Sequence, residues 1–146
     1  MEDYELTREL MLQLLKSRMT FRQTVQRVLK RNSIDMTFEM LQVMSRLWQD
    51  QGVSQQILAE RTAKDKACMT NLMNNLEKKG WVVRQENPSD RRNRLVYLTP
   101  EGEKMKECVC PLISDLYTQT GSEMGTDVIK SCITQLKRLD EIFNQL

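Results

Sequence analysis

Apolar residues recur at helical spacing near both ends of the chain. From Tyr4 to about Lys30 they fall mostly three, four or seven positions apart, which predicts one long amphipathic helix. Asn32-Ser33 interrupts this pattern. Thr37 can then cap a second helix, which should end at Asp50-Gln51-Gly52.

The middle of the chain contains two shorter helical patterns. Val53 is expected to pair briefly as a strand, and Ser54 can cap a helix from Gln55 to Arg61. Asp65 can cap another helix, whose buried side should begin at Cys68 or Met69 and which should end near Lys79. Gly80 stands where a left-handed terminal residue is needed.

A β-hairpin follows, and helices complete the chain. Residues 81–86 and 95–98 are rich in β-branched and aromatic residues and enclose a polar loop that contains proline. Thr99 is expected to cap a helix that runs to about Thr118, because proline and glutamate follow it. Thr120-Gly121 should break that helix. A last helix is predicted from about Thr126 to Asn144.

These elements predict a mainly α fold with a small β-hairpin wing, which is an α+β class. Residues 35–99 would form a winged helix-turn-helix domain. Residues 1–34 and residues 100–146 would supply flanking helices, and all three parts would form one intertwined unit. The order of short helix, tight turn, second helix and hairpin is typical of proteins that place the second helix in the major groove of DNA.

The second helix carries polar residues on the side opposite its apolar stripe. Ala67, Thr70, Asn71 and Asn74 share one face because they lie three or four positions apart. Asparagine can pair with adenine through two hydrogen bonds, and threonine can contact a thymine methyl group. A merely solvated face is the alternative interpretation. We expect the side chains that bind DNA to be Gln55, Lys64, Lys66, Ala67, Thr70, Asn71, Asn74, Asp90, Arg91, Arg92 and Asn93.

The hairpin loop from Ser89 to Arg94 is the second candidate DNA contact. An arginine at a hairpin tip can reach into a narrow, electronegative minor groove. Asp90 could orient such an arginine by an ion pair. A loop that is charged only for solubility is the alternative interpretation of this segment.

Composition and charge favour a globular protein with a local anion-binding surface. Hydrophobic residues make up 40% and charged residues 29% of the 146 residues, and no apolar run reaches the roughly 20 residues of a membrane span. The first residues lack signal-peptide features, so we expect a cytoplasmic protein. Residues 61–94 contain nine Lys and Arg against four Asp and Glu, although ordinary surface variation could produce this excess.

The chain has four cysteines and no histidine. The spacing of Cys68, Cys108, Cys110 and Cys132 fits no zinc template, and we predict neither a metal site nor a cofactor. Buried or half-buried thiols are the favoured interpretation of all four residues, and a redox sensor is the alternative. The absence of histidine, of a glycine-rich phosphate loop and of a paired-carboxylate pocket argues against an enzyme.

The wing carries a more specific resemblance. Residues 90–102, read as DRRNRLVYLTPEG, resemble the wing signature of the MarR family, in which D-x-R precedes a V-x-L-T-x-x-G run. Residues 56–61 resemble that family's first DNA-domain helix. Residues 65–72 and 76–82 resemble its recognition helix and the exit from it, and the similarity in helix order covers nearly the whole chain.

The resemblance implies a homodimeric transcription regulator that binds a pseudo-palindromic operator in double-stranded DNA. The first helix and the last two would form the dimerisation layer. Arg92 would be the minor-groove arginine and Asp90 its partner. Repression is the common mode of action in this family.

Many family members respond to small aromatic ligands in a cleft between the two layers, and such an effector is possible here. The candidate cleft residues are Met36, Met40, Met44, Trp48 and Met105, although methionines at helical spacing are more often core. Cys68 lies in the recognition helix, so a redox-responsive regulator is an alternative. A winged-helix module that binds another protein is a further alternative.

Overall fold

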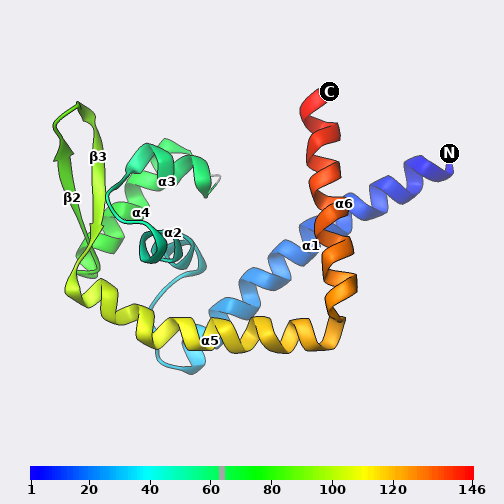
Figure 1. The fold of residues 1–146 in the computed structure, drawn as a ribbon, viewed down its shortest axis with the longest axis horizontal. Coiled ribbons are helices and arrows are strands. Elements are labelled where there is room, and N and C mark those ends of the chain that lie inside the picture. The colour runs from blue at the N-terminus through cyan, green and yellow to red at the C-terminus, as the bar shows by residue number, and fades with distance from the viewer. Residues whose placement is uncertain (63–64) are drawn as a thin grey trace. The chain divides into compact units, whose positions relative to one another are not determined.

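The computed structural model describes residues 1–62 and 65–146. Two compact units are present, Met1–Val109 and Cys110–Leu146, and each is described by itself. The elements in chain order are α1 (Glu2–Arg31), α2 (Phe38–Gln49), β1 (Val53–Ser54), α3 (Gln55–Arg61), α4 (Lys66–Lys78), β2 (Val82–Asn87), β3 (Asp90–Leu98), α5 (Pro100–Met124) and α6 (Thr126–Gln145), as Figure 1 shows. This order confirms the predicted mainly α fold with a small β wing.

The predicted helix caps are all present. In each case a side-chain oxygen accepts a hydrogen bond from the backbone N–H three residues further on, at donor–acceptor distances between 2.7 and 3.1 Å. Each cap satisfies one of the N–H groups that the first turn of a helix leaves without a partner inside the helix. The capping residues are Thr37 for α2, Ser54 for α3, Asp65 for α4 and Thr99 for α5.

The three strands form one antiparallel sheet in the order β1-β3-β2. Val82 pairs with Leu98 and Val83 with Tyr97, while Val53 of the short β1 pairs with Val96. Val82 and Val96 are buried, so one face of the hairpin base packs on the core. The pairing becomes irregular between Gln85 and Asn87, near the tip.

A single apolar core holds the first unit together. It is formed by the C-terminal part of α1, by α2, α3 and α4, by the base of the hairpin and by the first turns of α5. Complete burial of one Leu, Val or Met side chain stabilises the folded state by about 1.5–3 kcal/mol. The side chains that are almost completely buried are Val25, Leu29, Val43, Met44, Leu47, Leu58, Met69, Met73, Leu76, Val82, Val96 and Val109.

The start of α5 is fixed against the corner between α4 and β2. Thr99 donates its backbone N–H to the Trp81 carbonyl (3.0 Å) and its hydroxyl to the Gly80 carbonyl (2.5 Å). Trp48 of α2 donates its indole N–H to the Gly102 carbonyl over 3.0 Å. Gly80 has a φ of 76°, which confirms the left-handed residue predicted at the end of α4.

The predicted helix break at Thr120-Gly121 is wrong. Helix α5 continues to Met124, and the chain turns instead at Gly125, whose φ of 90° suits only glycine. Inside a helix, glycine costs only about 1 kcal/mol relative to alanine, so one glycine does not end a helix that other residues favour. The Gly125 N–H still bonds the Gly121 carbonyl (2.9 Å) and completes the last turn.

The loop predicted from Ser89 to Arg94 is shorter in the structure than the sequence indicated. Strand β3 begins at Asp90, which pairs with Asn87, so only Pro88-Ser89 connects the strands. Ser89 donates its N–H to Asn87 Oδ1 (3.0 Å), a local bond that tightens the turn. The arginines expected in a loop therefore lie on a strand, where their backbone directions are fixed by the sheet.

The predicted burial of the cysteines is contradicted at three positions. Cys68, Cys108 and Cys132 are exposed, and Cys110 is half-buried. On α4 the buried side begins at Met69, which is 1% exposed. Successive residues of a helix point about 100° apart, so the side chain of Cys68 is directed away from the core that Met69 enters.

In the second unit, α6 presents a long apolar stripe that this unit does not bury. None of the side chains of this helix is buried, and the structure describes all of its residues. Its large exposed apolar residues are Val128, Ile133, Leu136, Ile142 and Phe143. Among the described residues, no helix combines the length and apolar character required to cross a lipid bilayer.

Candidate nucleic-acid interface

Helices α3 and α4 form the helix-turn-helix, and α4 divides into a buried side and an exposed side. Met69, Leu72, Met73 and Leu76 face the core. On the outer side Lys66, Ala67, Asn71 and Asn74 are exposed, while Thr70 is half-buried. The predicted polar face is therefore present on α4. Lys64, also predicted to bind DNA, lies outside the described residues.

Asp65 at the start of α4 is held in its ionised form. The Cys68 backbone N–H donates to Asp65 Oδ1 over 2.7 Å and lowers the pKa of this carboxyl below its ordinary value of 3.8. A negative cap at this place also interacts favourably with the positive end of the helix dipole. The cap therefore fixes where the first turn of α4, with Lys66 and Ala67, begins.

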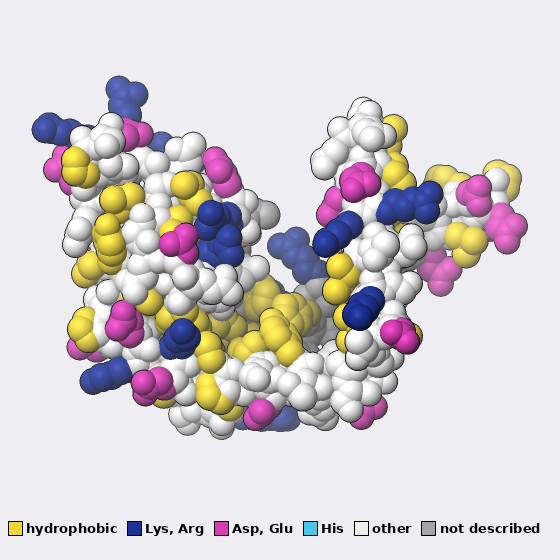
Figure 2. Space-filling model, in the orientation of Figure 1, with side chains coloured by type: hydrophobic (Ala, Val, Ile, Leu, Met, Phe, Trp, Pro, Cys, Tyr) yellow, Lys and Arg dark blue, Asp and Glu magenta, His cyan; other side chains and the backbone are white. Residues whose placement is uncertain are grey.

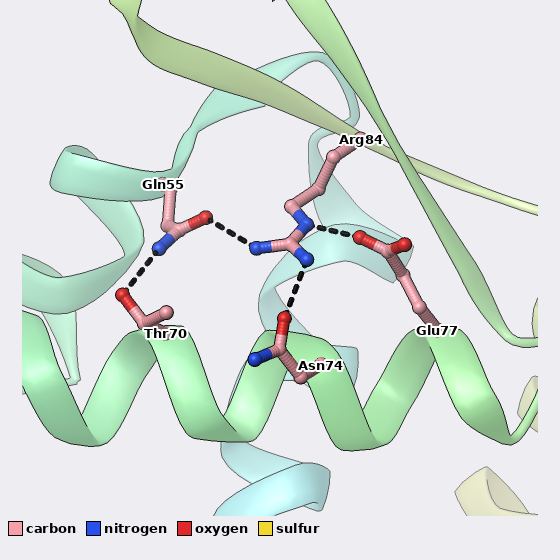
Figure 3. A network of polar contacts seen from close by, with 5 residues as sticks. All are labelled: Gln55, Thr70, Asn74, Glu77 and Arg84. Atoms are coloured by element: carbon pink, nitrogen blue, oxygen red, sulfur yellow. Dashed lines mark hydrogen bonds and ion pairs between the residues drawn. The ribbon is translucent and has the colours of Figure 1, made fainter.

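Three of the predicted residues are joined in one polar network, which Figure 3 shows. Arg84 of β2 lies at its centre and donates to Gln55 Oε1 (3.4 Å) and to Asn74 Oδ1 (2.6 Å). Arg84 also forms an ion pair with Glu77 of α4. Gln55 in turn donates from Nε2 to Thr70 Oγ1 (3.3 Å). The network ties the hairpin to both helices of the helix-turn-helix.

Sequence reasoning did not identify Arg84. The side chain is only 12% exposed, and its three partners lie 7, 10 and 29 positions away in the sequence. A charged residue that is so nearly buried requires compensating partners. The sequence shows only that a basic residue, Arg84, stands within a β-prone run. The spacing of residues along the chain does not indicate which side chains Arg84 contacts.

The wing presents two exposed arginines near its tip. Arg91 and Arg92 are the second and third residues of β3, and dark blue side chains project at the tip of the hairpin in Figure 2. Arg91 lies 3.4 Å from Glu86 across the hairpin, in a largely exposed pair that contributes little to stability. The wing is thus a rigid two-stranded support for exposed guanidinium groups.

The predicted ion pair between Asp90 and Arg92 is not formed in the described part of the chain. Asp90 Oδ1 accepts instead the backbone N–H of Arg92, over 3.1 Å. A short carboxylate side chain readily bonds the backbone two residues further on, and such a bond is satisfied without the guanidinium. Asp90 therefore fixes the backbone of Arg92, while the side chain of Arg92 remains exposed.

Asn93 has a role inside the fold. Its Oδ1 accepts the backbone N–H of Gln56 (3.3 Å), one of the N–H groups in the first turn of α3. The side chain is half-buried. Asn93 consequently joins the hairpin to the first helix of the helix-turn-helix, next to the exposed positions that precede it.

The residues predicted to line a ligand cleft belong to two groups. Met36, Met40 and Met44 are at most 7% exposed, as core side chains are. Trp48 and Met105 are half-buried, and the indole N–H of Trp48 already bonds the Gly102 carbonyl. The ligand cleft stays a prediction.

A helix-turn-helix followed by a two-stranded antiparallel wing defines a winged helix-turn-helix protein. Residues 37–93, which comprise α2 to the outer part of β3, match the model of the MarR family. The winged helix-turn-helix of this chain is therefore similar to that of the MarR family, as the wing motif indicated.

Comparison with individual proteins agrees with this similarity. The transcriptional regulator HosA of Escherichia coli O111:H- is 33% identical over 78 residues, which are 53% of this chain and 58% of HosA. The match thus spans a little more than half of that curated relative. The structure of AbfR of Staphylococcus epidermidis has a TM-score of 0.83, with 23% identity over 99% of this chain and 97% of AbfR. NadR has a TM-score of 0.72 with 23% identity, over 88% of this chain and 89% of NadR, and these values establish a shared fold.

Proposed function

We propose that this protein binds double-stranded DNA sequence-specifically and regulates transcription. Two features of the first unit together support this proposal. Helix α4 has an exposed polar face, and the β2–β3 wing carries exposed arginines. An α-helix fits the major groove, and the wing arginines suit the phosphates or the minor groove beside it. AbfR, which shares the fold, has been solved bound to DNA.

The regulator acts as a homodimer on a pseudo-palindromic operator. Support comes from apolar side chains that are exposed within their own units, on α6 and on the first two thirds of α1. Exposed apolar surface of this extent marks an interaction site. Two copies would present two recognition helices to half-sites about 34 Å apart, which is one turn of DNA. The exposed apolar residues of α1 are Tyr4, Leu6, Leu10, Leu12, Leu15, Met19 and Phe21.

The favoured mode is repression that a small apolar or aromatic ligand relieves. NadR has been solved with 4-hydroxyphenylacetate, which supports a ligand of this kind in the same fold. Trp48 and Met105, both half-buried, are the candidate cleft residues nearest to solvent. Thermal denaturation with and without aromatic carboxylic acids tests this mode, because a ligand that binds only the folded state raises the melting temperature.

A redox-responsive regulator is the alternative mode, and the exposure of Cys68 on α4 favours it. AbfR has been solved on DNA in both reduced and overoxidized forms. Oxidation of a thiol on the recognition helix adds polar bulk beside the DNA-binding face. Unchanged DNA affinity after peroxide treatment would remove this alternative.

DNA binding itself is tested by fluorescence anisotropy of the purified protein. The labelled DNA is an operator selected from genomic fragments, and random DNA of equal length is the control. Saturable binding by one dimer, with affinity that falls steeply as salt rises, supports the proposal because bound lysines and arginines release counterions from DNA. A protein-interaction module would show no preference over random DNA. Since the target is the genome, we expect the protein to act in the cytoplasm.

A further inference from the structure

The network around Arg84 determines which hydrogen-bonding groups α4 can offer to DNA. Arg84 projects from β2 toward α4, where Asn74 and Glu77 point at it (Figure 3), and its side chain is only 12% exposed. Its three partners are Asn74 and Glu77 of α4 and Gln55 at the start of α3. The Glu77 carboxylate neutralises the guanidinium, so the charge can remain beside the core.

A guanidinium group has hydrogen-bond donors and no acceptor. The atom of Asn74 that lies 2.6 Å from Arg84 Nη2 must therefore be the amide oxygen, and the same holds for the atom of Gln55 that lies 3.4 Å from Arg84 Nη1. Both amides are consequently held in one orientation. The Gln55 amide nitrogen is directed to Thr70 Oγ1, and the Thr70 hydroxyl donates to the Lys66 carbonyl (2.9 Å).

Among the described residues, none accepts a hydrogen bond from the Asn74 amide nitrogen. Asn74 keeps its amide N–H groups for a ligand, whereas its oxygen is already bound to a cation at short distance. Paired recognition of adenine needs a free oxygen for the N6 amino group as well as a nitrogen donor for N7. Asn74 Oδ1 has two lone pairs and Arg84 Nη2 already donates to one of them, so an adenine amino group would have to share this oxygen with the guanidinium. Guanine fits better, because its major-groove edge presents two adjacent acceptors, N7 and O6.

We propose that Arg84 is a specificity-determining positioning residue that makes Asn74 select guanine, by holding the Asn74 amide with its oxygen inward and its nitrogen toward DNA. This inference rests on the proposed DNA-binding function. It distinguishes two asparagines of α4 that the sequence alone presents as equivalent. None of the described residues bonds the amide of the exposed Asn71, so Asn71 keeps both groups for adenine.

The test is a binding panel on a selected operator in which each base pair of the half-site is replaced in turn. The protein is the full-length chain, and Asn74→Ala locates the position that Asn74 contacts. At that position the wild-type protein should prefer guanine to adenine by about fivefold or more, as one good base contact provides. Arg84→Met keeps an unbranched apolar stem but removes every donor. It should abolish the preference at that position and leave the position read by Asn71 unchanged.

Two further variants keep the inference open to refutation. Arg84→Lys retains a charged donor group without the forked geometry and should restore part of the guanine preference, which a purely structural role would not predict. Asn74→Asp retains the acceptor for Arg84 but removes the outward donor, so it should lose the guanine preference even if Arg84→Met does not fold. Circular dichroism melting curves establish the folding of each variant.

The possible failures are distinguishable. Adenine preferred at the Asn74 position, or Arg84→Met with an unchanged base profile, overturns the role of Arg84 while DNA binding stands. A uniform loss of affinity over all positions in Arg84→Met also overturns it, since Arg84 would then act only on stability. No preference by the wild-type protein for any sequence overturns the proposed function and this inference together.

Discussion

Gly102 lies so close to the backbone carbonyl of Trp81 that a Cβ atom on Gly102 would overlap that carbonyl. The first turn of α5 is thereby pressed against the corner between α4 and β2. The Gly102 carbonyl also accepts the indole N–H of Trp48 over 3.0 Å. This contact joins α2, α5 and the base of the wing at one point, so the orientation of the wing depends on a residue without a side chain.

Gly102→Ala should destabilise the protein. The overlapping atom belongs to the backbone, which cannot rotate away, and overpacking of this kind costs about 1–3 kcal/mol. Gly121→Ala is the matched control, because its added Cβ would meet only Ile129 Cδ1 at 3.7 Å, an ordinary contact. Alanine favours a helix by about 1 kcal/mol over glycine, so the control should melt at the same or a higher temperature. Equal melting temperatures for the two variants would contradict the close approach at Gly102.

The cap of α4 predicts a pH dependence. The hydrogen bond from the Cys68 N–H lowers the pKa of Asp65 in the folded protein below its value in the unfolded chain. A carboxyl group of this kind stabilises the fold above its unfolded pKa, and the contribution disappears as the pH falls through the folded pKa. Asp65→Asn keeps a capping oxygen but removes the charge. Urea denaturation should show the variant to be less stable than the wild type at pH 7, with the difference shrinking below about pH 4. A difference that stays constant down to pH 3 would show that the charge of Asp65 is not its cause.

Arg92→Ala should weaken DNA binding without unfolding the protein. Asp90 bonds the backbone N–H of Arg92, and alanine preserves that bond. The lost guanidinium is exposed, so only the contact with DNA is removed. Affinity should fall for all sequences, and the slope of log affinity against log salt should decrease by about one unit. Arg31→Ala, which removes an exposed arginine at the end of α1, is the control. The assignment of the wing fails if the two variants bind operator DNA equally well.

Asn71→Ala should relax base preference at one position of each half-site. The exposed amide of Asn71 can pair with adenine by two bonds, and such a contact contributes about 1–3 kcal/mol of discrimination. Anisotropy titrations with each of the four bases at every position would locate the effect. A loss of affinity that is the same for all bases would instead indicate a phosphate contact.

The elements that depend on neighbouring residues in the sequence were predictable. The caps Thr37, Ser54, Asp65 and Thr99 were identified because a cap bonds a backbone group only three positions away. The wing motif also indicated the MarR family, and the polar face of α4 follows from helical periodicity alone. At Thr120-Gly121 the same local reasoning failed, since a helix that its flanking residues favour tolerates one glycine.

The sequence by itself therefore determined the order of the elements, their caps, the resemblance of the wing to the MarR family and the face of α4 that is directed outward. Only the tertiary structure decided how that face is supported. Arg84 meets Gln55, Asn74 and Glu77 because β2 packs beside α3 and α4, and no spacing along the chain encodes that meeting. Asn93 joins Gln56 for the same reason. Hydrogen bonds act over about 3 Å in space, so the partners of a side chain are fixed once the whole chain is folded.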